Sequence, residues 1–139
     1  MRIVIAEARA PFAQDVATRD AGALADQLRQ RGHEVEAVSL PPSPAPAGIR
    51  ADATAWRLLD LGHSNMKPID LLIATGFPAY CVRHPRKVAW MSLEADAAAV
   101  PADLSERRAR MLAECTRVVA SLTRAPDGPW DAVIEQLLG

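Results

Sequence analysis

Three short segments of the chain, residues 2–6, 70–75 and 87–93, are apolar along most of their length. A strand with one face in water alternates apolar and polar residues, whereas a strand buried on both faces is a nearly continuous apolar run. Strands of the second kind belong to parallel sheets, because helical crossover connections cover both faces of such a sheet. These runs therefore predict a parallel sheet enclosed by helices.

The intervals between these runs supply the helices and two more strands. Residues 33–40 and 117–121 have the short β-type pattern of strands. Helical spacing and boundary residues predict four helices, at residues 20–31, 51–61, 101–115 and 129–138. Asp20 is the expected N-cap of the first helix, and Gly32 is expected just past its end. The predicted fold class is α/β: a single Rossmann-like, doubly wound, mostly parallel sheet with helices on both faces.

Length and composition set the remaining expectations. The 139 residues fit one domain, residues 1–139, in which the proline-rich residues 41–50 form an exposed loop. A net charge of −1 does not favour nucleic acid as a partner, and no apolar run is long enough to span a membrane. Cys81 and Cys115 lack metal-type spacing, so we expect free thiols in a reducing compartment, the cytoplasm.

In open parallel sheets, ligands bind beyond the carboxyl ends of the strands. The loops there contain neither Gly-x-Gly-x-x-Gly nor a Walker lysine, which argues against an ordinary dinucleotide or P-loop site. No catalytic residue, metal ligand set or cofactor is identified. Glu94 and Asp96 qualify as general bases only because they follow a strand. The candidate ligand-binding residues of these loops are Glu7, Arg9, Thr18, Thr75, Gly76, Phe77, Ser92 and Glu94.

The basic segment Arg83-His-Pro-Arg-Lys87 precedes a predicted strand instead of following one. It is therefore expected at the edge of the sheet opposite the ligand site. We predict that it is mainly a solvated connection.

Four stretches together resemble the amino-terminal half of family 4 glycosyltransferases with the GT-B fold, in order and in spacing. They are residues 1–5, residues 24–38 with "RGHEVE", residues 69–78 with "IDLLIATGFP", and residues 82–90 with "VRHPRKVAW". "RGHEV" occurs in many Rossmann-like domains, whereas the later Phe-Pro, Arg-His-Pro and Lys-Val-x-Trp series is more specific. The resemblance spans residues 1–125.

This resemblance implies an acceptor-facing domain that lacks the family's second domain, which binds the nucleotide sugar. Residues 18–22, "TRDAG", replace the family's glycine-rich turn, and residues 92–96, "SLEAD", replace its histidine-containing segment. No catalytic base is carried over. The partner is then a donor-domain polypeptide or a second copy, because a split enzyme leaves an apolar cleft wall exposed. A noncatalytic binding or assembly protein that kept the fold is the alternative, while a free nucleotide-binding domain lacks its phosphate fingerprint.

Overall fold

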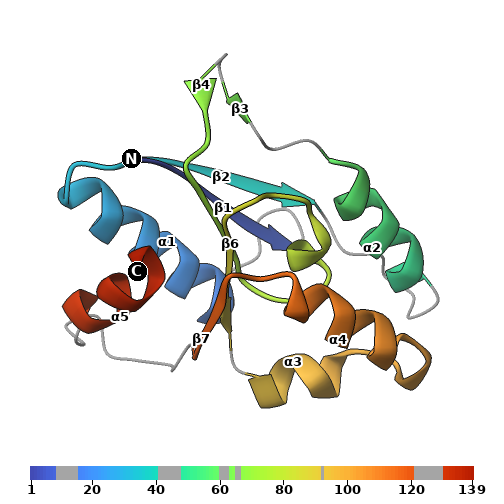
Figure 1. The fold of residues 1–139 in the computed structure, drawn as a ribbon. Helices are drawn as coiled ribbons and strands as arrows, with labels where there is room; N and C mark the ends of the chain where they lie inside the picture. The colour runs from blue at the N-terminus through green and yellow to red at the C-terminus, as the bar shows by residue number, and fades with distance from the viewer. Residues whose placement is uncertain (9–15, 41–47, 60–62, 65–66, 92, 121–129) are drawn as a thin grey trace.

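The computed structural model describes residues 1–8, 16–40, 48–59, 63–64, 67–91, 93–120 and 130–139 (Figure 1). Its centre is a five-stranded parallel sheet with the strand order β2-β1-β5-β6-β7. The strands are β1 (Arg2–Ala8), β2 (Glu34–Leu40), β5 (Leu71–Ala74), β6 (Lys87–Met91) and β7 (Arg117–Ala120). All five predicted strands are confirmed, and the α/β, Rossmann-like fold class is confirmed with them.

Helices cover both faces of the sheet, as the apolar runs predict. Leu71 and Ile73 of β5 join one buried cluster with α1 (Val16–Gln30) and α5 (Trp130–Leu138). The intervening residues Leu72 and Ala74 join the cluster on the other face. There the sheet is covered by α2 (Ile49–Leu58), the 3-10 helix η2 (Ala79–Cys81) and α4 (Ser105–Ala113). The two clusters explain why β5 has no polar position: neither face meets water.

Several predicted boundaries are wrong. Helix α1 begins at Val16, so Asp20 lies inside it and is not its N-cap; no glycine or proline between them interrupts the helix. Helix α2 includes residues 49 and 50, which the prediction assigned to the loop at 41–50. It ends where Leu59 turns extended, with φ −70° and ψ 137°. The rest of that proline-rich loop, residues 41–47, lies outside the described residues.

The predicted helix at residues 101–115 is divided. Its first turn is the 3-10 helix η3 (Ala102–Leu104), and α4 follows directly, because Leu104 at φ −106° and ψ 2° departs from α-helical geometry. Helix α3 (Leu93–Ala99) was not predicted, and it explains why β6 stops at Met91 rather than at residue 93. A short antiparallel pair, β3 (His63–Ser64) and β4 (Lys67–Pro68), was not predicted either.

The described part of the chain contains no helix with the length and apolar character needed to cross a bilayer.

Two glycines of the first helical segment provide a matched test of backbone conformation. A Cβ added to Gly22, inside α1, or to Gly32, just past it, would meet no atom within 4 Å. Gly32 has φ +88°, which L-residues rarely adopt, whereas Gly22 is helical. We therefore expect Gly22→Ala to raise the free energy of unfolding by about 0.5–1 kcal/mol and Gly32→Ala to lower it by about 1 kcal/mol. Urea denaturation measures both, and shifts of the same sign would contradict the assigned conformations.

Candidate functional site

The carboxyl ends of β1 and β5 lie side by side, since Ala6 pairs with Ala74 in the sheet. Glu7 follows Ala6 on β1 and is buried, with 5% of its surface exposed. Thr75 follows β5 and is held against β1 twice. Its backbone N–H donates to the carbonyl of Ala6 at 3.1 Å, and its hydroxyl lies 3.5 Å from the same oxygen. Glu7 and Thr75 thus belong to the ends of neighbouring strands.

The turn after β5 enters η2 through Gly76 and a cis Phe77–Pro78 peptide. The Phe77 ring is half-buried and meets the Tyr80 ring edge-on, with centroids 5.6 Å apart. Tyr80 itself is fully buried. The segment is therefore a strand-to-helix turn with a packed Phe77, and its helix is a single 3-10 turn.

Asp96 of α3 holds this turn through both of its carboxylate oxygens. Oδ1 accepts a hydrogen bond from the Phe77 backbone N–H at 2.8 Å. Oδ2 accepts one from the Tyr80 hydroxyl at 2.8 Å and one from Nε of Arg108, on α4, also at 2.8 Å. Burial, reinforced by the adjacent Asp96 carboxylate, raises the pKa of Tyr80, so its hydroxyl stays protonated as a donor. Asp96 therefore fastens three elements together, an arrangement that suits an anchor better than a general base.

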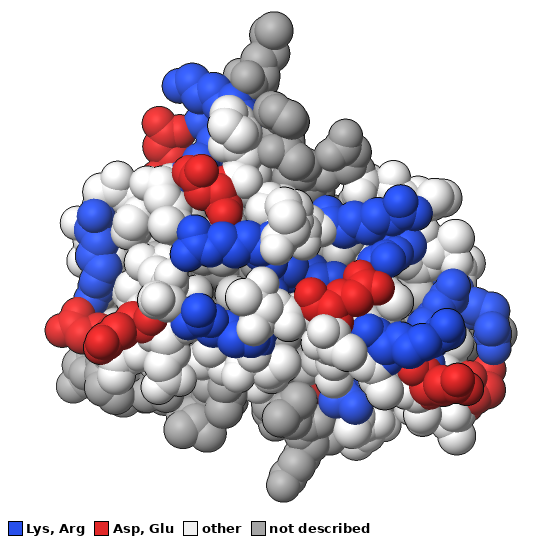
Figure 2. Space-filling model, viewed as in Figure 1, with Lys and Arg blue, Asp and Glu red and all other residues white. Residues whose placement is uncertain are grey.

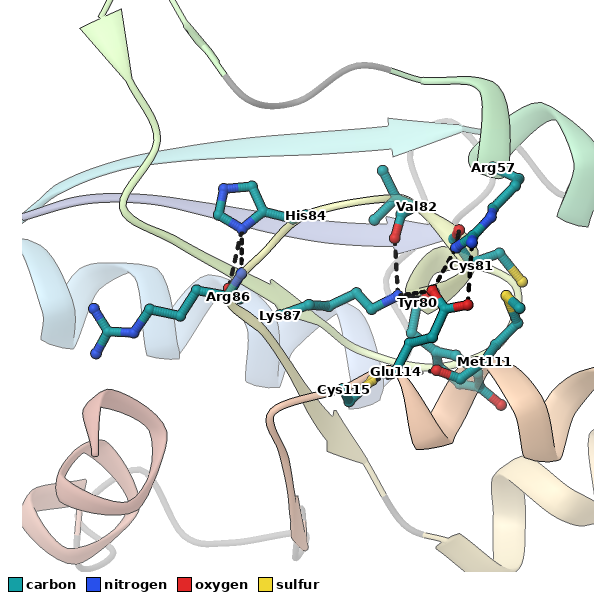
Figure 3. Close-up of polar contacts among 10 residues, drawn as sticks. All are labelled: Arg57, Tyr80, Cys81, Val82, His84, Arg86, Lys87, Met111, Glu114 and Cys115. Carbon is teal, nitrogen blue, oxygen red and sulfur yellow. Dashed lines mark hydrogen bonds and ion pairs between the residues drawn. The ribbon is translucent and has the colours of Figure 1, made fainter.

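A second polar cluster holds the other end of the same turn (Figure 3). The ammonium of Lys87, at the start of β6, donates to the carbonyls of Tyr80 at 2.6 Å and Val82 at 2.9 Å. Arg57 of α2 reaches the carbonyl between them, that of Cys81, at 3.3 Å. Two cations thus bind three successive carbonyls where η2 ends, which is where a helix presents partial negative charge.

Glu114 balances these cations. Its carboxylate accepts two hydrogen bonds from Arg57, at 2.6 and 3.0 Å, and lies 3.9 Å from the Lys87 ammonium. The Arg57 hydrogen bonds lower the pKa of Glu114, while burial lowers the pKa of Lys87. The cluster connects α2, η2 and β6 to the residue that ends α4.

The prediction that the basic segment at residues 83–87 is a solvated connection is partly wrong. It does lead into the amino end of β6, and Arg83 and Arg86 are exposed. Lys87, however, is only 1% exposed, because its side chain points to the helix-covered face, where the carbonyls of Tyr80 and Val82 bind its charge. Blue and red side chains lie next to one another over the face seen in Figure 2, so positive and negative charge are mixed on that face.

His84 of the same segment has a structural role. Its Nδ1 accepts a hydrogen bond from the Arg86 backbone N–H at 3.0 Å, and its Nε2 donates to the carbonyl of Ile69 at 3.0 Å. Both ring nitrogens are therefore engaged in holding the connection against the start of the β5 segment. Arg86 donates in turn to the Leu138 carbonyl at the end of α5.

Both cysteines are free thiols, as predicted. Burial raises the pKa of Cys81 to about 11 and also raises that of Cys115. Each thiol is therefore protonated at neutral pH, which argues against a nucleophilic role. Among the described residues there is no group of three His, Cys, Asp or Glu side chains that could hold a metal ion.

The structure unites part of the predicted site. Thr75, Gly76 and Phe77 form one turn beside the strand that carries Glu7. The backbones of Thr18 and Glu94 lie in α1 and α3, and Arg9 and Ser92 lie outside the described residues.

Three residues that organise this turn, Asp96, Tyr80 and Arg108, are absent from the candidate ligand-binding residues of the sequence analysis. Tyr80 and Arg108 both donate to the Asp96 carboxylate, and the three residues are far apart in the sequence. No local sequence pattern therefore indicates this arrangement.

No protein-family model matches this chain, and no curated protein matches it.

Proposed function

We propose that this chain is the acceptor-side domain of a family 4 glycosyltransferase with the GT-B fold. It acts with a donor-binding domain, on another polypeptide or in a longer enzyme. The main support for this proposal is the segment from Thr75 to Trp90. Its Phe-Pro, Arg-His-Pro and Lys-Val-x-Trp motifs are the most specific part of the resemblance to that family. In the fold this segment forms one connected unit that leaves the carboxyl end of β5 and returns through β6.

The chemistry of sugar transfer explains why a second domain is needed. A nucleotide-sugar donor leaves as a diphosphate, which preorganised hydrogen-bond donors or a metal ion must stabilise in the transition state. The sequence has no phosphate-binding glycine motif or Walker lysine. The arginines whose contacts are described near the turn, Arg57 and Arg108, already bind Glu114 and Asp96. In this proposal Glu7, Thr75 and Phe77 contact the acceptor.

The alternative is a noncatalytic binding or assembly protein that kept the fold. One observation favours it: both carboxylate oxygens of Asp96, on the helix that follows β6, are engaged within the protein. Such a carboxylate is poorly placed to accept a proton from a bound hydroxyl.

The purified chain alone is expected to neither hydrolyse nor transfer sugar from a panel of nucleotide sugars, because no group for the diphosphate is identified. Product release is compared with that of a heat-killed sample. Turnover above this control would contradict the proposal that the chain needs a separate donor-binding domain.

The acceptor role is tested with the tagged chain as bait in its native host. We expect recovery of a polypeptide that carries a donor-binding Rossmann-like domain and restores turnover when mixed with the chain. Thr75→Val should then weaken transfer and leave the association intact. Recovery of a donor-binding polypeptide without turnover would support the assembly role. A monomer that recovers no partner would contradict both the split enzyme and the assembly role.

A further inference from the structure

Three hydrogen-bond donors converge on the carboxylate of Asp96 beside the turn after β5. The Phe77 N–H, the Tyr80 hydroxyl and Nε of Arg108 each lie 2.8 Å from an oxygen of Asp96. They come from the turn, η2 and α4, whereas Asp96 comes from α3. We refer to these three donors as the carboxylate cradle.

We propose that the carboxylate cradle is an internal anion site that Asp96 fills as a tethered occupant, and that a small free carboxylate takes its place only when Asp96 is absent. The cradle is a property of this turn and of α4, so it does not depend on the proposed glycosyltransferase function. It lies just beyond the carboxyl end of β5, the region where ligands of open parallel sheets bind.

The arrangement of the donors suits a planar group with two acceptor oxygens. One oxygen faces the backbone N–H, and the other faces the phenol and the guanidinium. A Cβ at Gly76 would lie 3.4 Å from Oδ1 of Asp96, which is an ordinary van der Waals contact, whereas the backbone there has φ +157°, which L-residues rarely adopt. A tetrahedral anion has further oxygens that would need space and donors of their own.

The guanidinium of Arg108 makes the cradle selective for a charged acceptor. The side chain of Asp96 is 7% exposed and that of Arg108 is 16% exposed, so this ion pair is largely shielded from solvent. Hydrogen bonds to an ionised group are about twice as strong as neutral ones. Because Asp96 is attached to the same chain, its effective concentration at the cradle is far above that of a free ligand. A free carboxylate therefore gains access when Asp96 is removed.

The test is chemical rescue of the Asp96→Gly variant, followed by thermal unfolding. Sodium formate and sodium acetate are compared with sodium chloride and sodium phosphate at equal ionic strength and pH. We expect formate to raise the transition midpoint of the variant by about 4 °C at ten times its dissociation constant. The wild-type chain should shift no more in formate than in chloride.

Two further variants make the assignment specific. Asp96→Gly combined with Arg108→Met should lose the formate effect, whereas Asp103→Gly, at an exposed ion pair, should show none. An equal shift with phosphate, an equal shift in the wild type, or no shift in the Asp96→Gly variant would each overturn the proposal. If that variant is recovered only as aggregate, its refolding yield in formate against chloride decides the same question.

Discussion

Replacing Asp96 with asparagine is expected to lower the free energy of unfolding by about 3 kcal/mol. The carboxylate accepts three hydrogen bonds at 2.8 Å, one of them from the Arg108 guanidinium. Asparagine keeps the shape but loses the charge, and its NH2 group would face one of these donors. The variant thus leaves at least one buried donor unpaired. Chemical denaturation, monitored by tryptophan fluorescence, measures the loss.

Asp103→Asn is the matched control for Asp96→Asn. Asp103 also pairs with an arginine, Arg50, at 2.8 Å, but these two side chains are 67% and 61% exposed. Water competes for an exposed pair, so the control should change stability by less than about 0.5 kcal/mol. If both substitutions lower the free energy of unfolding by the same amount, burial is not the reason that the Asp96 interactions are strong.

Replacing Lys87 with methionine is expected to lower the free energy of unfolding by about 2 kcal/mol. Methionine fills similar space but leaves the carbonyls of Tyr80 and Val82 without their lysine donor. Removing the buried ammonium offsets part of this cost, because its desolvation penalty disappears as well. Glu114 keeps its two hydrogen bonds to Arg57, so no carboxylate is left uncompensated. Lys67→Met, at an exposed residue of β4, should change stability by less than about 0.5 kcal/mol.

The pH dependence of the Lys87→Met effect provides an independent check. Burial lowers the pKa of Lys87 below its usual 10.5, so the unfolded chain holds this proton to higher pH than the folded chain does. Between the two pKa values the unfolded state binds more protons, and the stability of the wild type rises with pH. The advantage of the wild type over Lys87→Met should therefore grow as the pH approaches 10.5. An advantage that shrinks over this range would show that the folded protein favours the charged amine.

The architecture was largely predictable because it depends on local pattern. The continuous apolar runs at residues 70–75 and 87–93 predict strands buried on both faces, and the structure confirms them. Helix α5 was also predictable, since Trp130, Val133, Ile134 and Leu137 recur at helical spacing and all are buried. Helix boundaries were less predictable, because they depend on the backbone geometry of single residues such as Leu59 and Leu104.

Sequence determined the layers of this protein and the edge of the sheet where ligands are expected, because hydrophobic periodicity records which side of each element faces the core. Tertiary structure alone decided the roles of the charged residues. Lys87 has the sequence context of a solvated residue in a basic segment. The fold, however, places Glu114 and the carbonyls of residues 80–82 around Lys87 and Arg57. Asp96 stabilises the fold through its hydrogen bonds to the turn after β5 and to Arg108 of α4. A buried charge is stabilised by the partners that surround it, and those partners lie in other parts of the chain.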